Sequence, residues 1–120
     1  MGPVATSNAL RGVSFGLLAS ADGLTTTNVF VAVGDNGTVL RSEDGVAWTV
    51  ITPFTSANLL AVTNGGRFVA VGAGGVIFTS SDGITWETRS SGTTADLTSV
   101  ARTVQGYTAV GDAGTNVSTF

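Results

Sequence analysis

The sequence predicts an all-β protein made of antiparallel four-stranded blades of a β-propeller, about three blades in one chain. A short motif, S-x-D-G-x-x-W, occupies residues 42–48 and recurs 38 residues later at residues 80–86. A matched apolar run precedes each copy of the motif and recurs a third time. No window of eleven residues has helical apolar spacing without glycines inside it. A repeat of about 40 residues with four short strands has the size of one propeller blade.

Each repeat is predicted to begin with two strands, of which the second is continuously apolar. Such a strand is typical of a sheet buried on both faces, as when one sheet lies between two others. A third strand follows, and Trp48 and Trp86 begin the fourth strands. The first strands are expected at residues 10–13, 59–62 and 97–100, the second at 30–34, 68–72 and 107–111, and the third at 38–40, 76–78 and 115–117.

Glycine-rich turns separate the second and third strands, at residues 34–37, 72–75 and 111–114. Glycine and asparagine supply the positive φ angles of a tight hairpin. Polar residues in these turns and between the repeats are the candidate lining of shallow ligand sites. They are Asp35, Asn36, Asp112, Asn58 and Asp96.

The S-x-D-G-x-x-W motif has a physical rationale as a lock on a hairpin. Its Asp accepts backbone N–H bonds across the turn, its Gly supplies a left-handed residue, and its Trp covers the turn. The residues concerned are Ser42, Asp44, Gly45, Trp48, Ser80, Asp82, Gly83 and Trp86. This pattern resembles the Asp-box, or BNR repeat, of sialidase-type and photosystem-assembly-factor-type propellers. The resemblance implies a propeller whose boxes are structural and lie away from any active site.

The catalytic residues of a sialidase are not recognisable in this chain. Tyr107 is the only tyrosine and falls on a core-type strand, while Glu43 and Glu87 lie in or beside the boxes. The chain also has no Cys and no His, which removes thiolate and imidazole metal ligands and the commonest general base. We therefore expect no enzyme activity and no catalytic, cofactor-binding or metal-binding residue.

Composition restricts the partners of the chain. The 120 residues are 42% hydrophobic and 11% charged, with five Arg, no Lys and a net charge of −3. Five scattered arginines make no basic patch, which argues against nucleic-acid binding. Arg11 and residues 13–18 imitate a signal peptide, but this apolar run is too short to span a bilayer, which takes about 20 residues. The low charge favours an extracellular or virion surface over the cytoplasm, although GC-rich coding produces a similar bias.

Residues 1–120 are read as one domain with repeats at 8–56, 57–94 and 95–120. The first repeat carries about eleven extra residues, roughly 16–28, read as a degenerate hairpin with a partner-binding loop as the alternative. The third repeat lacks the motif and a fourth strand, and residues 1–7 are a candidate closing strand.

Three blades do not close a ring, since natural propellers have about four to eight. We expect self-association, with a dimer of six blades favoured, or another chain that completes the third blade; a fragment of a longer propeller is the rival. The predicted function is a non-enzymatic structural or adhesion module, for example a virion decoration, fibre or other surface component. The alternatives are a carbohydrate-binding, lectin-like propeller and an assembly factor that binds a protein partner.

Overall fold

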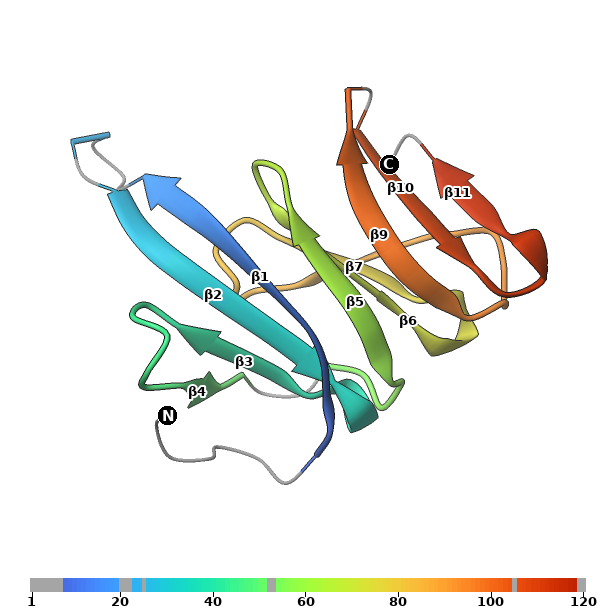
Figure 1. Cartoon of the computed structure of the whole chain (residues 1–120), viewed down its shortest axis with the longest axis horizontal. Coiled ribbons are helices and arrows are strands. Elements are labelled where there is room, and N and C mark those ends of the chain that lie inside the picture. Colours follow the sequence, from blue (N-terminus) through green and yellow to red (C-terminus); the bar gives the residue numbers. More distant parts are fainter. Residues whose placement is uncertain (1–7, 20–22, 25, 52–53, 105, 119–120) are drawn as a thin grey trace.

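Three antiparallel sheets follow one another along the chain in the computed structural model, which describes residues 8–19, 23–24, 26–51, 54–104 and 106–118 (Figure 1). Their strand orders are β1-β2-β3-β4, β5-β6-β7-β8 and β11-β10-β9. The only helical elements in these residues are three 3-10 turns, so the all-β prediction is confirmed. We call the sheets 1, 2 and 3.

The strands are short, and each sheet repeats one pattern of hairpins. Sheet 1 contains β1 (Leu10–Ala19), β2 (Thr26–Gly34), β3 (Val39–Ser42) and β4 (Thr49–Val50). Sheet 2 contains β5 (Leu59–Asn64), β6 (Phe68–Gly72), β7 (Ile77–Ser80) and β8 (Glu87–Arg89). Sheet 3 contains β9 (Leu97–Thr103), β10 (Gly106–Gly111) and β11 (Asn116–Ser118). The 3-10 turns η1 (Asp35–Gly37), η2 (Ala73–Gly75) and η3 (Asp112–Gly114) join the second and third strands.

The third strands begin one residue later than predicted, because the residue before each strand belongs to the turn. The amide of Thr38 donates to the carbonyl of Asp35 at 3.2 Å, and the amide of Thr115 donates to the carbonyl of Asp112 at 3.1 Å. These bonds close the 3-10 turns η1 and η3. Thr38 and Thr115 are therefore used as turn residues and not as the first residues of a ladder.

The extra residues of the first repeat mostly lengthen a hairpin. The pairing of β1 with β2 continues past Phe15 and Phe30 to Ala19 and Thr26. Gly16 and Leu17, which the sequence places in an insertion, therefore belong to the regular antiparallel pairing of β1 with β2. Most of the remaining connection, residues 20–22 and 25, lies outside the described residues, as does the candidate closing strand at residues 1–7.

The core lies between consecutive sheets. We call the face of each sheet toward the preceding repeat its upstream face and the opposite one its downstream face. One core cluster joins the downstream face of sheet 1 to the upstream face of sheet 2, and a second joins sheets 2 and 3 in the same way. The principal side chains are Val29, Val31, Val33 and Val39 against Phe68, Ala70 and Phe78, and then Val69, Val71 and Ile77 against Leu97, Tyr107 and Ala109.

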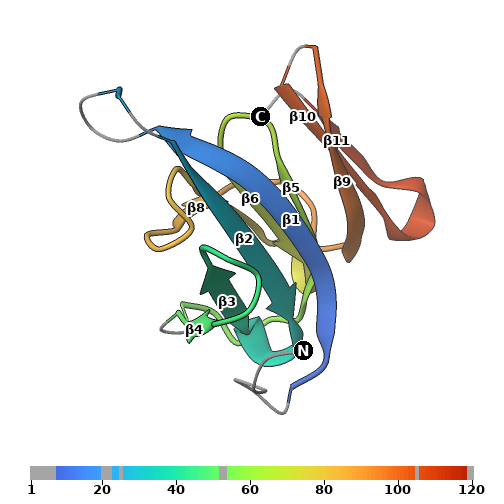
Figure 2. The same cartoon turned by 60° about the vertical axis from the view of Figure 1, so that its left-hand side comes forward.

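The first strands β1, β5 and β9 are neighbours, and the rest of each sheet extends away from them (Figures 1 and 2). This arrangement is compatible with blades that share an inner edge. The sequence predicts burial on both faces for all three second strands, and β6 alone is buried along its whole length. Strand β10 differs, because Tyr107 and Ala109 are buried while Val110 is exposed. Among the described residues no sheet covers the downstream face of sheet 3.

Candidate functional site

The first motif forms a compact turn between β3 and β4, held by two side chains. The hydroxyl of Ser42 donates to Oδ1 of Asp44 at 3.0 Å and accepts the amide of Gly45 at 2.8 Å. The same carboxylate oxygen accepts the amides of Val46 at 2.8 Å and Ala47 at 2.9 Å. A short side chain that accepts backbone amides two and three residues ahead fixes the chain reversal locally. Gly45 takes the left-handed conformation, with φ of 77°.

The second motif repeats this geometry between β7 and β8. Oδ1 of Asp82 accepts the amides of Ile84 at 2.8 Å and Thr85 at 3.0 Å, and Ser80 accepts the amide of Gly83 at 2.8 Å. The indole of Trp86 donates from Nε1 to the carbonyl of Gly83 at 3.1 Å. It also stacks on the ring of Phe54, in the segment before sheet 2. The motif residues therefore tie the turn to the core.

These hydrogen bonds change the acidity of the two aspartates. Backbone amides of Val46 and Ala47, with the Ser42 hydroxyl, hold the pKa of Asp44 below its ordinary value. Burial raises the pKa of Asp82, but the bonds from Thr85, Ile84 and Ser80 together outweigh it, so the net pKa is also lowered. Hydrogen bonds to the charged form favour ionisation. Both aspartates stabilise the fold as carboxylates.

Acid is expected to destabilise the protein partly through Asp82, and Asp82→Asn is expected to remove that part. Because the pKa of Asp82 is lower in the folded state, its contribution is complete above the unfolded value of about 3.9 and is lost as pH falls through the folded pKa. Asparagine keeps the acceptor oxygen without the charge. The difference in Tm between wild type and Asp82→Asn should therefore shrink from pH 7 to pH 2 in circular-dichroism melts. An exposed aspartate outside the boxes, changed in Asp112→Asn, is the control, and a pH-independent difference for Asp82→Asn contradicts the prediction.

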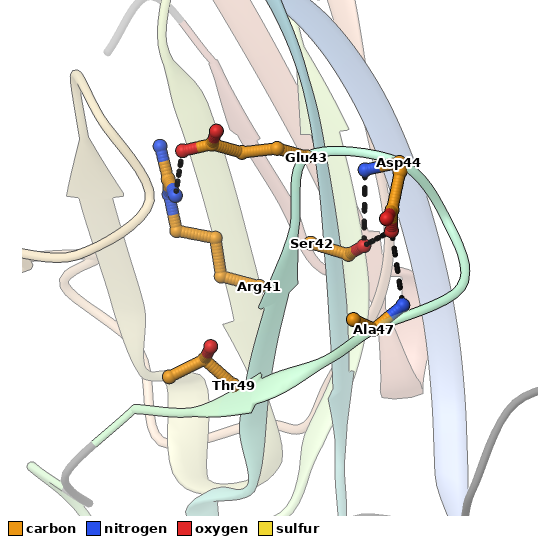
Figure 3. A pocket seen from close by; sticks show the side chains of 6 residues that line it. All are labelled: Arg41, Ser42, Glu43, Asp44, Ala47 and Thr49. Carbon is orange, nitrogen blue, oxygen red and sulfur yellow. Dashed lines mark hydrogen bonds and ion pairs between the residues drawn. The ribbon is translucent and has the colours of Figure 1, made fainter.

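A shallow hollow of about 220 Å³ lies beside the first motif (Figure 3). It is lined by Arg41, Ser42, Glu43, Asp44, Ala47 and Thr49. The charged groups of this hollow and the Ser42 hydroxyl already have partners in the protein. The guanidinium of Arg41 contacts Glu43 at 3.0 Å through Nη1, and its Nε donates to the carbonyl of Asp82 in the neighbouring sheet at 2.8 Å. Arg41 therefore joins the first sheet to the box of the second.

The arrangement in the hollow favours a structural role. Ser42 is buried, and its hydroxyl is bonded to a carboxylate whose pKa is lowered. A carboxylate of low pKa is a weak general base, so the pair is poorly suited to activating a nucleophile. No group of three or more Asp, Glu, His or Cys side chains with the spacing of a metal site occurs among the described residues.

The residues proposed from sequence as ligand loops lie at the opposite end of the sheets from the boxes, as the strand directions require. Asp35 forms a two-point ion pair with Arg11, from Nε to Oδ1 at 2.9 Å and from Nη2 to Oδ2 at 3.1 Å. The hydrogen bond from Arg11 is the main reason why the pKa of Asp35 is lowered. Asp112 is exposed, and its amide donates to the carbonyl of Asp96 at 3.0 Å.

Asn58 and Asp96 have a role that sequence reasoning missed. Oδ1 of Asn58 accepts the amide of Asn36 at 2.9 Å, and Oδ1 of Asp96 accepts the amide of Gly74 at 2.9 Å. In both cases a side chain at the start of one repeat holds the 3-10 turn of the repeat before it. The common separation of 22 residues is the sequence signal that identifies this lock. All five ligand-loop candidates thus contribute side-chain or amide bonds to the scaffold.

No family model, no curated protein and no solved structure matches this chain. The likeness to Asp-box repeats therefore depends on the motif residues and the geometry of their turns. In the described part of the chain no helix has the length and apolar character needed to cross a membrane.

Proposed function

We propose that the chain is a non-enzymatic structural or adhesion module that self-associates through its blade-like sheets. In this proposal the three sheets are part of a β-propeller that a second copy of the chain completes. The proposal depends on sheet-to-sheet packing as the source of stability, since each core cluster needs side chains from two consecutive sheets. A sheet without such a neighbour leaves an apolar face or an unpaired edge that proteins cover.

The observation that carries the proposal is the contrast between the middle sheet and the outer ones. Phe68 of β6 is fully buried, whereas its equivalent on β2, Phe30, is partly buried. Val13 of β1 is 64% exposed, whereas its equivalent on β5, Val62, is partly buried. In sheet 3, β11 pairs with β10 on one side, and no described residue pairs with its other edge. A second copy offers the same types of surface and would cover both features.

We further propose an extracellular or virion-surface setting, such as a decoration or fibre component. The support is compositional, because a chain with five Arg, no Lys and 11% charged residues has few groups for steering toward nucleic acids. The Ser42, Asp44, Arg41 and Glu43 side chains at the first motif already form hydrogen bonds or ion pairs within the protein, which supports a scaffold role for this end of the sheets.

The mass of the purified chain in solution tests self-association. One chain weighs 12.0 kDa, and light scattering coupled to size-exclusion chromatography is expected to give twice that mass over a wide range of concentrations. A mass of one chain at every concentration contradicts the proposal, because sheets 1 and 3 would then be stable without a second copy.

A further inference from the structure

Two of the five arginines have no acidic partner among the described residues. Arg11, Arg41 and Arg89 each form an ion pair with a carboxylate of the chain. Arg67 and Arg102 form no ion pair with a described residue, although the chain has a net charge of −3. They lie far apart in the sequence, but the fold brings both to the place where the hairpin between β5 and β6 faces sheet 3 (Figure 1). We call Arg67 and Arg102 the arginine pair.

One tyrosine and one hairpin hold both side chains of the arginine pair. The guanidinium of Arg67 lies over the ring of Tyr107, with Cζ 5.0 Å from the ring centroid. The Tyr107 hydroxyl donates to the carbonyl oxygen of Arg67 at 3.2 Å, which fixes the ring against the hairpin. Arg102 is paired with Tyr107 across β9 and β10, so their side chains share the face that packs on sheet 2. There the Arg102 side chain lies so close to Gly65 that a methyl group on that glycine would collide with it.

The equivalent place between sheets 1 and 2 holds neutral residues. Val29 occupies the strand position of Arg67 one repeat earlier, and it is fully buried. Asn64 occupies the position of Arg102, since each is paired with the aromatic residue that begins its second strand. Asn64 also lies against a glycine, Gly16, in the way that Arg102 does. Because the same sheet contact forms with a valine and an amide, packing does not explain two cations between sheets 2 and 3.

The charge of Arg67 is poorly compensated where it stands. The side chain is partly buried, and its Nε is buried without a hydrogen-bond acceptor. Removing a cation from water without an opposite charge costs free energy, and stacking on a tyrosine ring offsets only part of that cost. Arg102 is exposed, so the arginine pair is open to solvent on its side. An anion bound there would supply the missing opposite charge.

We propose that the arginine pair is a binding site for a single oxyanion group, which is a carboxylate, a phosphate or a sulfate. The planar guanidinium forms two parallel hydrogen bonds with such groups. Tyr107 holds the guanidinium of Arg67 in place before the ligand arrives, so less side-chain freedom is lost on binding. Two arginines make no extended basic patch, and the ligand is therefore one anionic group and not a nucleic acid. The site does not depend on the proposed self-association.

An NMR titration of the arginine side chains tests the site. The Nε–Hε signals are followed at pH 6 and constant ionic strength while inorganic phosphate, sulfate, acetate or chloride is added. We expect an oxyanion to shift the signals of Arg67 and Arg102 together with one dissociation constant, and to leave that of Arg89, which already has Glu87, nearly unchanged. Saturation by acetate identifies a carboxylate site, and saturation by phosphate or sulfate alone identifies a site for a tetrahedral anion. Equal shifts with chloride, or shifts of Arg102 alone, overturn the proposal.

Three variants and a matched control locate the binding. Arg67→Gln and Arg102→Gln are each expected to raise the dissociation constant by about 10-fold or more, the effect of losing a charged hydrogen bond. Gly65→Ala keeps both arginines but displaces the Arg102 side chain, so we expect a loss of similar size. Arg89→Gln removes an exposed arginine outside the site and should leave the constant within about 3-fold of wild type. Circular-dichroism melts check that each variant folds, and equal losses for Arg67→Gln and Arg89→Gln overturn the site, whatever the mass of the chain in solution.

Discussion

Replacing Gly72 by alanine is expected to disrupt the contact between the end of β6 and residues 58–59, where the linker joins β5. We expect the free energy of unfolding to fall by about 3 kcal/mol or more. Gly72 is extended, with φ of −168°, so its backbone conformation does not demand glycine. Glycine is needed because the backbone of residues 58–59 lies too close to leave room for a side chain. A methyl group there would collide with the carbonyl oxygen of Asn58 and lie 3.0 Å from Cα of Leu59. That carbonyl also accepts the amide of Ala73 at 2.9 Å, a bond that the displaced backbone would lose.

The matched control is Gly74→Ala, two residues away in the same 3-10 turn. Gly74 has φ of +74°, but no atom lies within 4 Å of the place where a methyl would stand. The equivalent position of sheet 3 is already an alanine, Ala113, with φ of 58°. The cost should therefore be that of one left-handed alanine, about 1 to 2 kcal/mol. Urea titrations of both variants measure the difference, and equal destabilisation would show that the close approach at Gly72 is not what matters.

Phe68→Ala is expected to lower the free energy of unfolding by about 3 to 5 kcal/mol, because it removes a buried ring from the core between sheets 1 and 2. The ring is fully buried and packs with Trp86, whose centroid lies 6.5 Å away. Removing it leaves a cavity lined by two sheets that are each fixed by their own ladders and boxes. The surroundings then have little freedom to collapse, which places the cost at the upper part of the usual range.

The control for this prediction is Phe30→Ala, the same residue one repeat earlier. Phe30 lies on the outer face of sheet 1, half-buried against Phe15 and Trp48. Its removal exposes less new hydrocarbon and forms no enclosed cavity, so we expect about 1 kcal/mol. Both titrations are performed at low protein concentration, where association contributes least. A similar loss for the two variants would indicate that the Phe30 face is covered within a single chain.

The sequence predicted the sheets well because its period and its turn residues are local signals. The three apolar runs form β2, β6 and β10, and the three glycine turns form η1, η2 and η3. The long first hairpin was less clear. Its glycine and threonine residues are typical of a loop, yet Val13, Phe15 and Leu17 alternate with small residues, which is the period of a strand with one apolar face.

The contacts across repeats could not be read in the same way. Arg41 reaches the carbonyl of Asp82 over 41 residues, and nothing in the composition around either residue marks the pair. The sequence favours ligand residues at Asn58 and Asp96 because an Asn or Asp between strands has many uses. Their partners are backbone amides in another repeat, which become apparent only when two repeats are placed side by side.

The positions of Asn58 and Asp96 make the folding of one repeat depend on the next. Asn58 accepts the amide of Ala73 through its carbonyl and the amide of Asn36 through its side chain, so one residue holds the turns of two sheets. Asp96 does the same for Asp112 and Gly74. Nearest-neighbour coupling of this kind is what gives repeat proteins their cooperativity. The three sheets therefore form a single folding unit, in which opening any one linker releases the turns on both sides of it.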